Sequence, residues 1–530
     1  MPSTSSDPAP GDQQPETGAR VAHAPTATPA VSRRGFLSAA LVGLTQKAGR
    51  PIAGGLVNES HVAGHQLRDG AAFPGPREER RTSIVIVGGG MAGLCAGWRL
   101  AKRGLDDFVI LEMEREAGGN SRWGEDEVSA YPWGAHYVPI PGKTAGLVRE
   151  IFTDLGVFDG RVWDERHLVH APAERLFIHG RWQEGLEPAV GPTRRDRDQF
   201  ATFAARMDGL RASGRFTIPM AAGTDPTRPP PEDALSMAAW LDRERLDSPW
   251  LRWMVDYACR DDYGGPARDV SAWAGILYFA AREADDTGPL TWPEGNGWIV
   301  RRLLQRLGAR VETARMTYRV ERLGRRWRVL TPQVAWTADV VIMAAPLHVA
   351  TRLVPGAPTP AVTSSPWVTA NLSLDRWPRE SGFPVAWDNV IFDSPALGYV
   401  VATHQQLRRH VPRTVWTYYW ALSHLPAADA RRWLLAQDYP TLRDRILADL
   451  SRAHPDIREC VSRVDIMRFG HAMVRPTPGL LANPQWRALQ NGQDHLYYAH
   501  SDLSGLPLFE EAQYRGVLAA DRAIGVLKGR

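Results

Sequence analysis

The stretch SIVIVGGGMAGLCAGWRL, residues 83–100, joins an apolar run to three glycines and then to a segment with helical character. The apolar run 84–87 predicts a buried strand, because short apolar runs that end in glycine are typical of central strands. The segment from about 91 to 103 predicts a helix. A strand that turns through glycines into a helix is an arrangement that holds the phosphates of a nucleotide.

The glycines of this stretch fit the pattern Gly88-x-Gly90-x-x-Gly93, in which each glycine has its own task. The first permits a tight turn, the second lets the backbone approach a pyrophosphate, and the third lets the helix pack on the strand. The backbone amides at the start of the helix, those of Met91 and Ala92 among them, would then point at the phosphates. This pattern alone is weak evidence, so its surroundings decide the interpretation.

A second apolar run, DFVILE at 107–112, ends in Glu112. A carboxylate at the end of the second strand accepts hydrogen bonds from a ribose 2′-hydroxyl and would repel a 2′-phosphate. We therefore expect the nucleotide to be FAD or NAD rather than NADP. The alternative is that Glu112 is a surface glutamate at a strand end.

Further motifs follow in order: EREAGGNSRW at 114–123, YPWGAHYV at 131–138 and WPEGNGWIVRRLLQRLGARVETARMTYRV at 292–320. ADVVIMAAPLHVATRLV at 338–354 and YYAHSDLSGLPLFEEAQYRGVLAADRAI at 497–524 complete the series. Together they resemble the flavin-containing amine oxidase superfamily, which includes monoamine and polyamine oxidases and is related to phytoene desaturases. The resemblance implies an α/β fold, with a Rossmann-like FAD-binding domain of the glutathione-reductase type and an inserted α+β substrate domain.

The resemblance also implies which residues bind FAD. In the family a glycine pair after the ribose-binding glutamate lets the chain wrap the cofactor, a Gly-Ala-His segment lies near the flavin ring, and an acidic residue belongs to the closing signature. Carried over to this chain, the cofactor-binding residues are Gly88, Gly90, Met91, Ala92, Gly93, Glu112, Gly118, Gly119, Asn120, Arg122, Gly134, Ala135, His136, Thr317, Asp502 and Leu508. No histidine or cysteine attachment motif is recognisable, so we expect FAD to be bound non-covalently.

Some departures from the family pattern bear on the chemistry. Amine oxidases of the family commonly place a lysine near flavin N5, in the strand WVTANLSLDRW at 367–377, where this chain has Thr369 and Ala370. No other lysine can replace it, because the interval 144–527 contains none. Leu508 stands where the family often has an aromatic residue, His500 replaces a glycine and Asn120 replaces an arginine. These changes are compatible with FAD binding but weaken the assignment to an oxygen-using amine oxidase.

The motifs divide the chain into regions. Residues 1–80 are expected to form a disordered leader, which carries an export signal, and a linker. The FAD motifs fall in 81–140, 286–356 and 490–530, which predicts a discontinuous FAD-binding domain. The segments in between, 141–285 and 357–489, are expected to form the substrate-binding domain.

Four residues are candidates for catalysis or substrate recognition: His136, Asp262, Tyr263 and Trp298. The family places the histidine near the flavin, where it could act as a base, and the tryptophan where a residue lines the substrate cavity. Asp262 and Tyr263 end a predicted helix at the expected cavity wall, where a carboxylate could attract a cationic amine. The alternatives are a core histidine bonded to backbone and a local salt bridge between Arg260 and the acids.

The segment SRRGFLSAALVGL, residues 32–44, resembles a twin-arginine export signal. Its apolar run is short, and no clear cleavage site follows. We expect the twin-arginine export machinery to be a partner and the protein to be periplasmic or secreted, or cytoplasmic if the signal is not functional. No stretch of about 20 apolar residues is present, so we expect no stable membrane anchor.

The composition limits the remaining function classes. Lysine and arginine together number 63 against 59 for aspartate and glutamate, and neither sign forms a long block, so we expect no nucleic-acid binding. The three cysteines lie far apart with no Cys/His cluster, so the sequence indicates neither a metal site nor a disulfide framework.

These features predict an FAD-dependent oxidoreductase that transfers hydride from a C–H bond of a small molecule, an amine or polyamine in the first instance, to flavin N5. The alternatives are an FAD-dependent desaturase or isomerase of a hydrophobic substrate, an NAD-dependent dehydrogenase and a non-catalytic flavin-binding module. The sequence does not determine the substrate, the electron acceptor or the oligomeric state.

Overall fold

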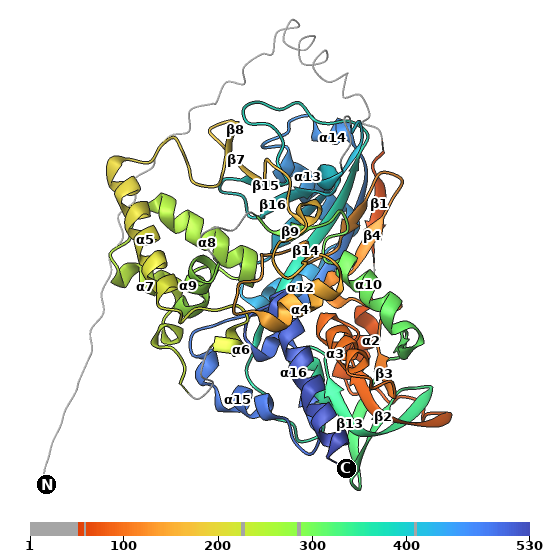
Figure 1. Ribbon diagram of the computed structural model, residues 1–530. Coiled ribbons are helices and arrows are strands. Elements are labelled where there is room, and N and C mark those ends of the chain that lie inside the picture. Colours follow the sequence, from red (N-terminus) through yellow and green to blue (C-terminus); the bar gives the residue numbers. More distant parts are fainter. Residues whose placement is uncertain (1–50, 58–59, 224–227, 283–287, 407–410, 530) are drawn as a thin grey trace, which may run out of the picture. The chain divides into compact units, whose positions relative to one another are not determined.

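The computed structural model describes residues 51–57, 60–223, 228–282, 288–406 and 411–529. The expected export signal at 32–44 lies outside the described residues. The part of the chain from Arg50 onward contains two large β-sheets, which Figure 1 shows together with the helices that cover them.

The first sheet is built around the strand of the glycine-rich stretch. Its central strands are parallel, and an antiparallel hairpin, β11–β12, extends one edge. In order across the sheet the strands are β10 (Val311–Glu312), β3 (Phe108–Leu111), β2 (Glu78–Val87), β13 (Val334–Met343), β12 (Arg326–Leu330) and β11 (Arg319–Leu323), with β19 (Leu496–Tyr498) paired to β13. The strand expected at 84–87 is therefore the last part of a longer strand.

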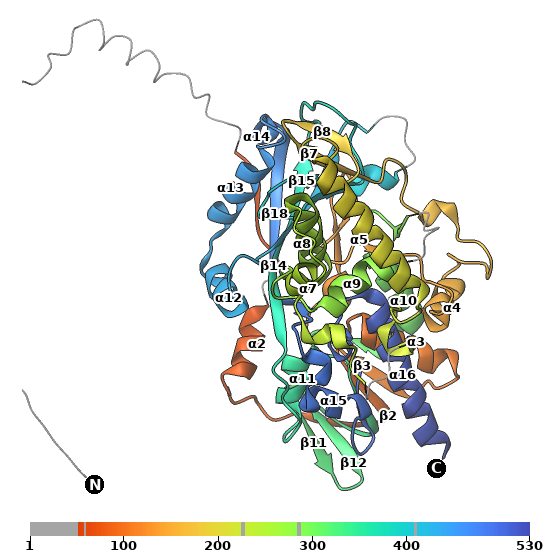
Figure 2. The ribbon, with the colours of Figure 1, turned by 90° about the vertical axis from the view of Figure 1, so that its left-hand side faces the viewer.

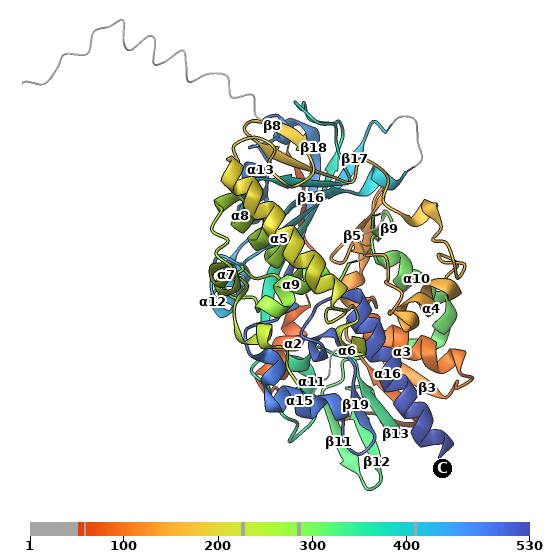
Figure 3. The same cartoon turned by 60° about the vertical axis from the view of Figure 1, so that its left-hand side comes forward.

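Alternate residues of β2 point to opposite faces of this sheet. Helices cover one of these faces. Ile84 and Ile86 pack in the apolar cluster that contains α3 (Met91–Lys102), α10 (Gly297–Leu307) and α16 (Phe509–Lys528). Figure 3 shows α3 and α16 side by side, and a Cβ on Gly516 would lie 2.2 Å from the carbonyl oxygen of Ala92. Glycine at that position therefore allows the close approach of α16 to α3.

The second sheet is mostly antiparallel and larger. In order across the sheet its strands are β1 (Ala53–Leu56), β18 (Val461–Arg475), β14 (Thr363–Leu374), β17 (Thr414–Ala421), β16 (Gly398–Val401), β15 (Asp388–Ile391), β7 (Glu174–Ile178) and β8 (Arg181–Glu184). A group of helices packs together beside it, as Figure 2 shows: α5 (Arg194–Ala212), α7 (Met237–Arg243), α8 (Pro249–Tyr263) and α9 (Ala272–Ala280). Trp273 and Leu277 of α9 are buried in the core of this region.

The remaining described α-helices are α2 (His61–Arg68), α4 (Gly146–Asp154), α6 (Met220–Gly223), α11 (Leu347–Leu353), α12 (Ala427–Ala436), α13 (Tyr439–Leu450), α14 (Ile457–Cys460) and α15 (Pro484–Asn491). They range from 4 residues in α6 and α14 to 12 residues in α13. Two small pairs of strands complete the fold: β4 (Trp123–Glu125) with β5 (Ala130–Pro132), and β6 (Tyr137–Val138) with β9 (Leu290–Thr291). No helix among these described residues is long and apolar enough to cross a membrane.

The fold class predicted from the sequence, an α/β protein with a Rossmann-like domain, is confirmed. The division at residue 80 differs from the structure, because residues 51–80 are not simply a linker. Strand β1 pairs in parallel with β18, and residues 61–68 form the helix α2. The hydroxyl of Tyr439 donates to the carbonyl of Ala53 at 2.9 Å, which ties β1 to α13 as well.

Gly54 is the residue of β1 on which this docking depends. Its φ is +126°, and a Cβ there would lie 1.8 Å from the carbonyl oxygen of Val464. We predict that Gly54→Ala detaches β1, so that limited proteolysis cleaves between residues 50 and 60 at least ten times faster, since detached edge segments are readily cut. Gly55→Ala is the matched control, because a Cβ there meets nothing within 4 Å. Equal cleavage rates for the two variants would contradict the docking.

Candidate functional site

The turn between β2 and α3 forms the first part of the site. Gly88 has a φ of +111°, and a Cβ on Gly93 would lie 1.9 Å from the carbonyl oxygen of Gly88. Both positions therefore require glycine. Gly90, at the start of α3, has more room, since a Cβ there would meet only the Cα of Gly119, at 3.9 Å. Open space beside the first amides of a helix, those of Met91 and Ala92, suits a pyrophosphate.

The chain after β3 wraps this turn. The carboxylate of Glu112 accepts hydrogen bonds from the amides of Gly89 at 2.7 Å and Glu114 at 2.8 Å. Burial raises the pKa of Glu112, and these two hydrogen bonds oppose the rise. Across the turn, the amide of Gly118 donates to the carbonyl of Gly89 at 2.8 Å, and Gly119 lies beside Gly90. The expected ribose carboxylate and the glycine pair thus border the open space at the start of α3.

The next segment leads from the turn toward the second sheet. The carbonyl of Asn120 accepts a hydrogen bond from the amide of Ala135 at 2.8 Å, and a Cβ on Gly134 would lie 2.3 Å from the same oxygen. The side-chain amide of Asn120 donates to a backbone carbonyl of β18. Arg122 is buried, and its Nε donates to the carbonyl of Gly119 at 3.1 Å. These contacts hold the expected flavin-ring segment against the second sheet.

Three expected cofactor residues come from distant parts of the chain. Thr317 is buried, and its hydroxyl has no hydrogen-bond partner in the described part of the chain, so it is free to serve a ligand. Asp502 accepts a hydrogen bond from the amide of Leu347 at 2.9 Å and lies 3.1 Å from Nδ1 of His500. Burial alone would raise the pKa of Asp502, but these neighbours keep it below its ordinary value. Leu508 precedes α16 and lines a cavity.

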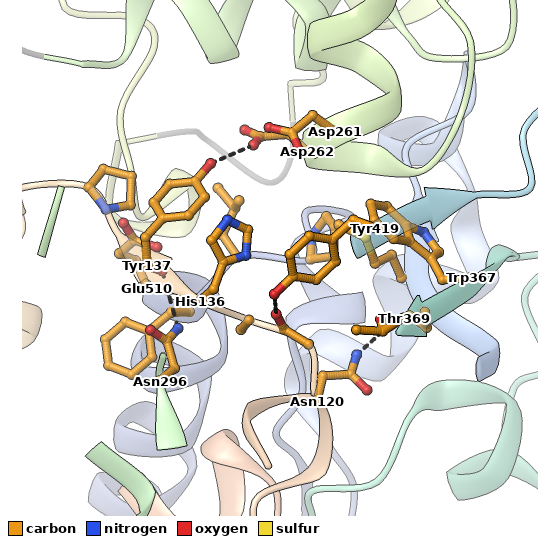
Figure 4. A pocket seen from close by; sticks show the side chains of 18 of the residues that line it. Asn120, His136, Tyr137, Asp261, Asp262, Asn296, Trp367, Thr369, Tyr419 and Glu510 are labelled. Atoms are coloured by element: carbon orange, nitrogen blue, oxygen red, sulfur yellow. Dashed lines mark hydrogen bonds between the residues drawn. The ribbon is translucent and has the colours of Figure 1, made fainter. Parts of the chain in front are cut away.

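Residues that follow the glycine turn in the chain, from Asn120 to Pro139, contribute to this cavity, which Figure 4 shows from close by. Strands β14, β17 and β18 form one wall, while the end of α8 and the start of α16 contribute carboxyl groups. The side chains that line it include Asn120, His136, Tyr137, Asp261, Asp262, Arg282, Asn296, Trp367, Thr369, Tyr419, Leu508, Phe509 and Glu510. Thr369 thus lines the cavity at the position where the family has its lysine.

His136 stands in the middle of an aromatic group. Its ring stacks on Tyr419 with centroids 4.6 Å apart and contacts Tyr137 and Trp387 at 4.9 and 5.5 Å. Burial lowers the pKa of His136 to about 4, so the imidazole is neutral at neutral pH. A base with so low a pKa accepts a proton only weakly, and the geometry favours His136 as part of the wall.

The paired acids at the end of α8 do face the cavity. The hydroxyl of Tyr137 donates to Asp262 at 3.3 Å, as Figure 4 shows, and the guanidinium of Arg282 lies 3.7 Å from the same carboxylate. Burial raises the pKa of both Asp261 and Asp262. The neighbouring carboxyl of Asp262 raises the pKa of Asp261 further, whereas Arg282 and the hydroxyl of Tyr137 oppose the rise at Asp262. The alternative salt bridge with Arg260 is not formed, because Arg260 pairs with Asp256 at 3.2 Å.

Two of the candidate catalytic residues lie elsewhere. Trp298 does not line the cavity: its ring stacks on Trp292 with centroids 4.6 Å apart, and the guanidinium of Arg302 lies 3.3 Å from the ring centre. Tyr263 is fully buried in the core, and its hydroxyl donates to the carbonyl of Ala274 at 2.8 Å. Both side chains are occupied by packing, so neither can contact a substrate in this cavity.

Sequence reasoning missed Glu510, Arg282 and Tyr137. Glu510 is 2% exposed and belongs to the first turn of α16, within the closing motif itself. Burial raises its pKa to about 8, with a further contribution from Glu511. Glu510 lies two residues after Leu508, the expected aromatic position, so the closing motif could have indicated it. Nothing in the local sequence of Arg282 indicates that it reaches the same cavity.

The comparisons with known proteins agree with this architecture. Residues 86–155 match a family described as an NAD(P)-binding Rossmann-like domain. A Baeyer-Villiger monooxygenase of Penicillium patulum is 46% identical over 44 residues, which are 8% of this chain and only 7% of that protein. The shared stretch is thus a small part of both proteins.

Solved structures resemble nearly the whole described chain. A putrescine oxidase bound to putrescine has a TM-score of 0.63 at 15% identity, over 84% of this chain and 100% of its own. Cyclohexylamine oxidase from Brevibacterium oxydans has a TM-score of 0.63 at 16% identity, over 84% and 99%. A fatty acid isomerase from P. acnes that produces CLA has a TM-score of 0.60 at 16% identity, over 83% and 98%. At such identities the likeness establishes a shared fold, that of amine oxidases and this isomerase.

The open space at Gly90 yields a prediction. Gly90→Ala should leave the thermal unfolding midpoint of the cofactor-free protein unchanged, because its Cβ has no protein atom closer than 3.9 Å. It should weaken nucleotide binding at least tenfold, because the methyl group would occupy the pyrophosphate position. Fluorescence titration of the cofactor-free protein with FAD measures the affinity. Gly525→Ala, whose Cβ meets nothing within 4 Å on α16, is the control. An FAD affinity of Gly90→Ala equal to that of the wild type would show that the turn between β2 and α3 does not bind the nucleotide.

The raised pKa of Glu510 predicts a pH-dependent stability difference. A buried carboxyl with a pKa of about 8 binds its proton more tightly in the folded protein than in the unfolded chain. It therefore lowers the free energy of unfolding as pH rises from its ordinary value of 4.5 toward 8. Glu510→Gln should match the wild-type unfolding midpoint near pH 4 and exceed it by about 2 °C or more at pH 9. Glu79→Gln, at an 80% exposed side chain, is the control. A difference in unfolding midpoint between Glu510→Gln and the wild type that does not change with pH would show that the pKa of Glu510 is not raised.

Proposed function

We propose that the protein is an FAD-dependent oxidoreductase that oxidises a C–H bond next to the nitrogen of a small cationic amine. The observation that supports this proposal most strongly is the cavity lining. It combines three carboxyl groups, Asp261, Asp262 and Glu510, with one guanidinium, that of Arg282, and with aromatic rings. An excess of acid and π-faces in a buried cavity favours an organic cation.

The glycine turn and Glu112 fit the adenosine diphosphate part of FAD, since the space at Gly90 is open and Thr317 has an unused hydroxyl. The flavin part would reach the segment from Asn120 to His136. FAD bound there supplies a hydride acceptor. We infer non-covalent attachment, because no cysteine lines the cavity and its one histidine, His136, is packed among aromatic rings in the described part of the chain.

The protein's own residues would orient the substrate and exclude water. The stacked rings of His136 and Tyr419 and the indole of Trp367 give the cavity flat walls against which a cation can lie. Asp262 is fixed by the hydroxyl of Tyr137, so its carboxylate has a defined direction. A fixed charge in a site shielded from water acts more strongly than a mobile one at the surface.

A hydrophobic substrate, as in an FAD-dependent desaturase or isomerase, is the second candidate. Trp367, Phe469 and Met473 form an apolar part of the same cavity, and the fold is shared with a fatty acid isomerase. Such a substrate offers no partner for the buried carboxyls at the other end. The amine is therefore the better match to the whole lining.

We also propose export by the twin-arginine machinery, because the segment 32–44 combines Arg33-Arg34 with an apolar run before the folded region begins. Replacing both arginines by lysine should keep the full-length protein inside the cell, whereas the wild type is recovered outside the inner membrane. Cell fractionation of a bacterial host measures the distribution, and the paired Arg431→Lys and Arg432→Lys change is the control. Equal export of both variants would exclude the signal.

The amine proposal is tested by anaerobic reduction of the flavin. Putrescine, cyclohexylamine or n-butylamine should bleach the flavin absorbance, while linoleic acid should not. Asp262→Asn should raise the amine concentration needed for half-maximal reduction about tenfold, with a smaller change in the limiting rate, because it removes a recognition charge. Glu79→Gln should leave both unchanged. Bleaching by linoleic acid alone would favour a desaturase, and isomerisation of linoleic acid without net bleaching would favour an isomerase. Absence of bleaching by every amine would overturn the proposal.

A further inference from the structure

The carboxyl groups of the cavity come from two separate elements. Asp261 and Asp262 end α8, and Glu510 lies in the first turn of α16, with Tyr137 between these elements. Figure 4 shows both aspartates at one end of the cavity, where the hydroxyl of Tyr137 points at Asp262. The fold therefore brings together acidic side chains that are far apart in the sequence.

These groups have few protein partners. Glu510 is 2% exposed, and in the described part of the chain no other side chain donates a hydrogen bond to its carboxyl. Asn296 is fully buried and lines the cavity with an unpartnered Oδ1. The Nε of Arg282 is likewise buried without a hydrogen bond within the described residues. Buried polar atoms without partners indicate that a ligand completes the set.

The surroundings cannot neutralise all of this charge. Around the aspartates stand Arg282, Arg260, Tyr137, Tyr278, Tyr257 and Tyr419, together with Glu174 and Asp388, which add to the acidic side. Glu510 faces Arg282 and Asp262 from other elements and Glu511 on its own helix. Glu511 is already engaged by the amide of Met220. Arg260 is paired with Asp256, which leaves Arg282 as the cation that faces both sets of acids.

Several like charges close together in a buried site cannot all be ionised, so at least one carboxyl keeps its proton. Burial raises the pKa of Glu510 to about 8, above the values at which carboxyls ordinarily ionise. His136 does not take this proton at neutral pH, because burial lowers its pKa to about 4. The pKa of Asp261 is raised as well, but Asp261 has Arg260 and Arg282 near it, whereas Glu510 has Arg282 alone. Glu510 is therefore the stronger candidate to hold the proton.

We propose that the cavity is a proton-coupled cation site, in which Glu510 holds a proton that an entering organic cation displaces to solvent. The inference deepens, and rests on, the proposed oxidation of a cationic amine. The balance is simple: a protonated Glu510 and a free cation become an ionised Glu510 paired with the bound cation, and one proton leaves. A substrate ammonium paired in this way has a carboxylate beside it that can accept its proton before oxidation.

A quaternary ammonium ion tests the coupling without ambiguity, because it carries no proton that could be released by the ligand itself. Butyltrimethylammonium would be mixed with the FAD-loaded protein in weak buffer containing a pH indicator, and binding would be followed by the flavin difference spectrum. We expect roughly one proton to be released per cation bound at pH 7 and much less above pH 9. The dissociation constant should fall about tenfold per pH unit between pH 6 and 7.5.

Glu510→Gln should remove most of the proton release and flatten the pH dependence of the affinity in this range, leaving only the contribution of Asp261, while Glu79→Gln behaves as wild type. The flavin spectrum and thermal unfolding of each variant verify that it is folded. Binding of the cation without proton release by the wild type would overturn the proposal, and so would undiminished release by Glu510→Gln. If the quaternary ion does not bind, n-butylamine takes its place with 1-butanol as the neutral control, and failure of both cations to bind also overturns it.

The outcomes distinguish this inference from the proposed function. Flavin reduction by amines together with proton-free binding would contradict the coupling and leave amine oxidation intact. Proton-coupled binding without reduction by any amine would contradict amine oxidation as the activity and retain the cation site.

Discussion

The close approach of α3 to the turn after β2 is the constraint on which the rest of the site depends. It is possible because the first turn of the helix presents Gly93 to the carbonyl of Gly88, where any side chain would collide. At Gly90, where the same helix begins, no side chain caps the helix and a Cβ would meet only the Cα of Gly119, at 3.9 Å. Everything that surrounds this position, from Glu112 to the glycine pair, is positioned by hydrogen bonds to the turn or its neighbours.

The second requirement is that a single cavity collects residues from both halves of the fold. The segment from Asn120 to His136 leaves the glycine turn and is fastened to the second sheet through the side chain of Asn120. Helix α16, which packs on α3 through Gly516, begins at the same cavity and carries Glu510 into it. The glycine turn and the acidic cavity are therefore connected by the segment from Asn120 to His136 and by the packing of α16 on α3.

The sequence predicted the local features well and the long-range ones poorly. The strand, turn and helix around Gly88 could be predicted because their signals, apolar periodicity and glycine spacing, are local. Strand β1 was missed because AGGL is short and rich in glycine, and only pairing with β18 makes it a strand. Trp298 was placed in the cavity by resemblance, but stacking on Trp292 turns it into the core. Arg282 was missed because only the packing of α9 beside α8 brings it to the acids.

The proposed activity requires that the glycine turn and the acidic cavity together hold FAD for oxidation of a cation. The most direct measurement is the identity and amount of nucleotide released when the purified protein is precipitated with acid. We expect FAD in the supernatant at close to one per chain and a colourless pellet. NAD in the supernatant, or a protein that contains no nucleotide and cannot be loaded with FAD, would contradict this requirement, and yellow colour in the pellet would contradict non-covalent binding.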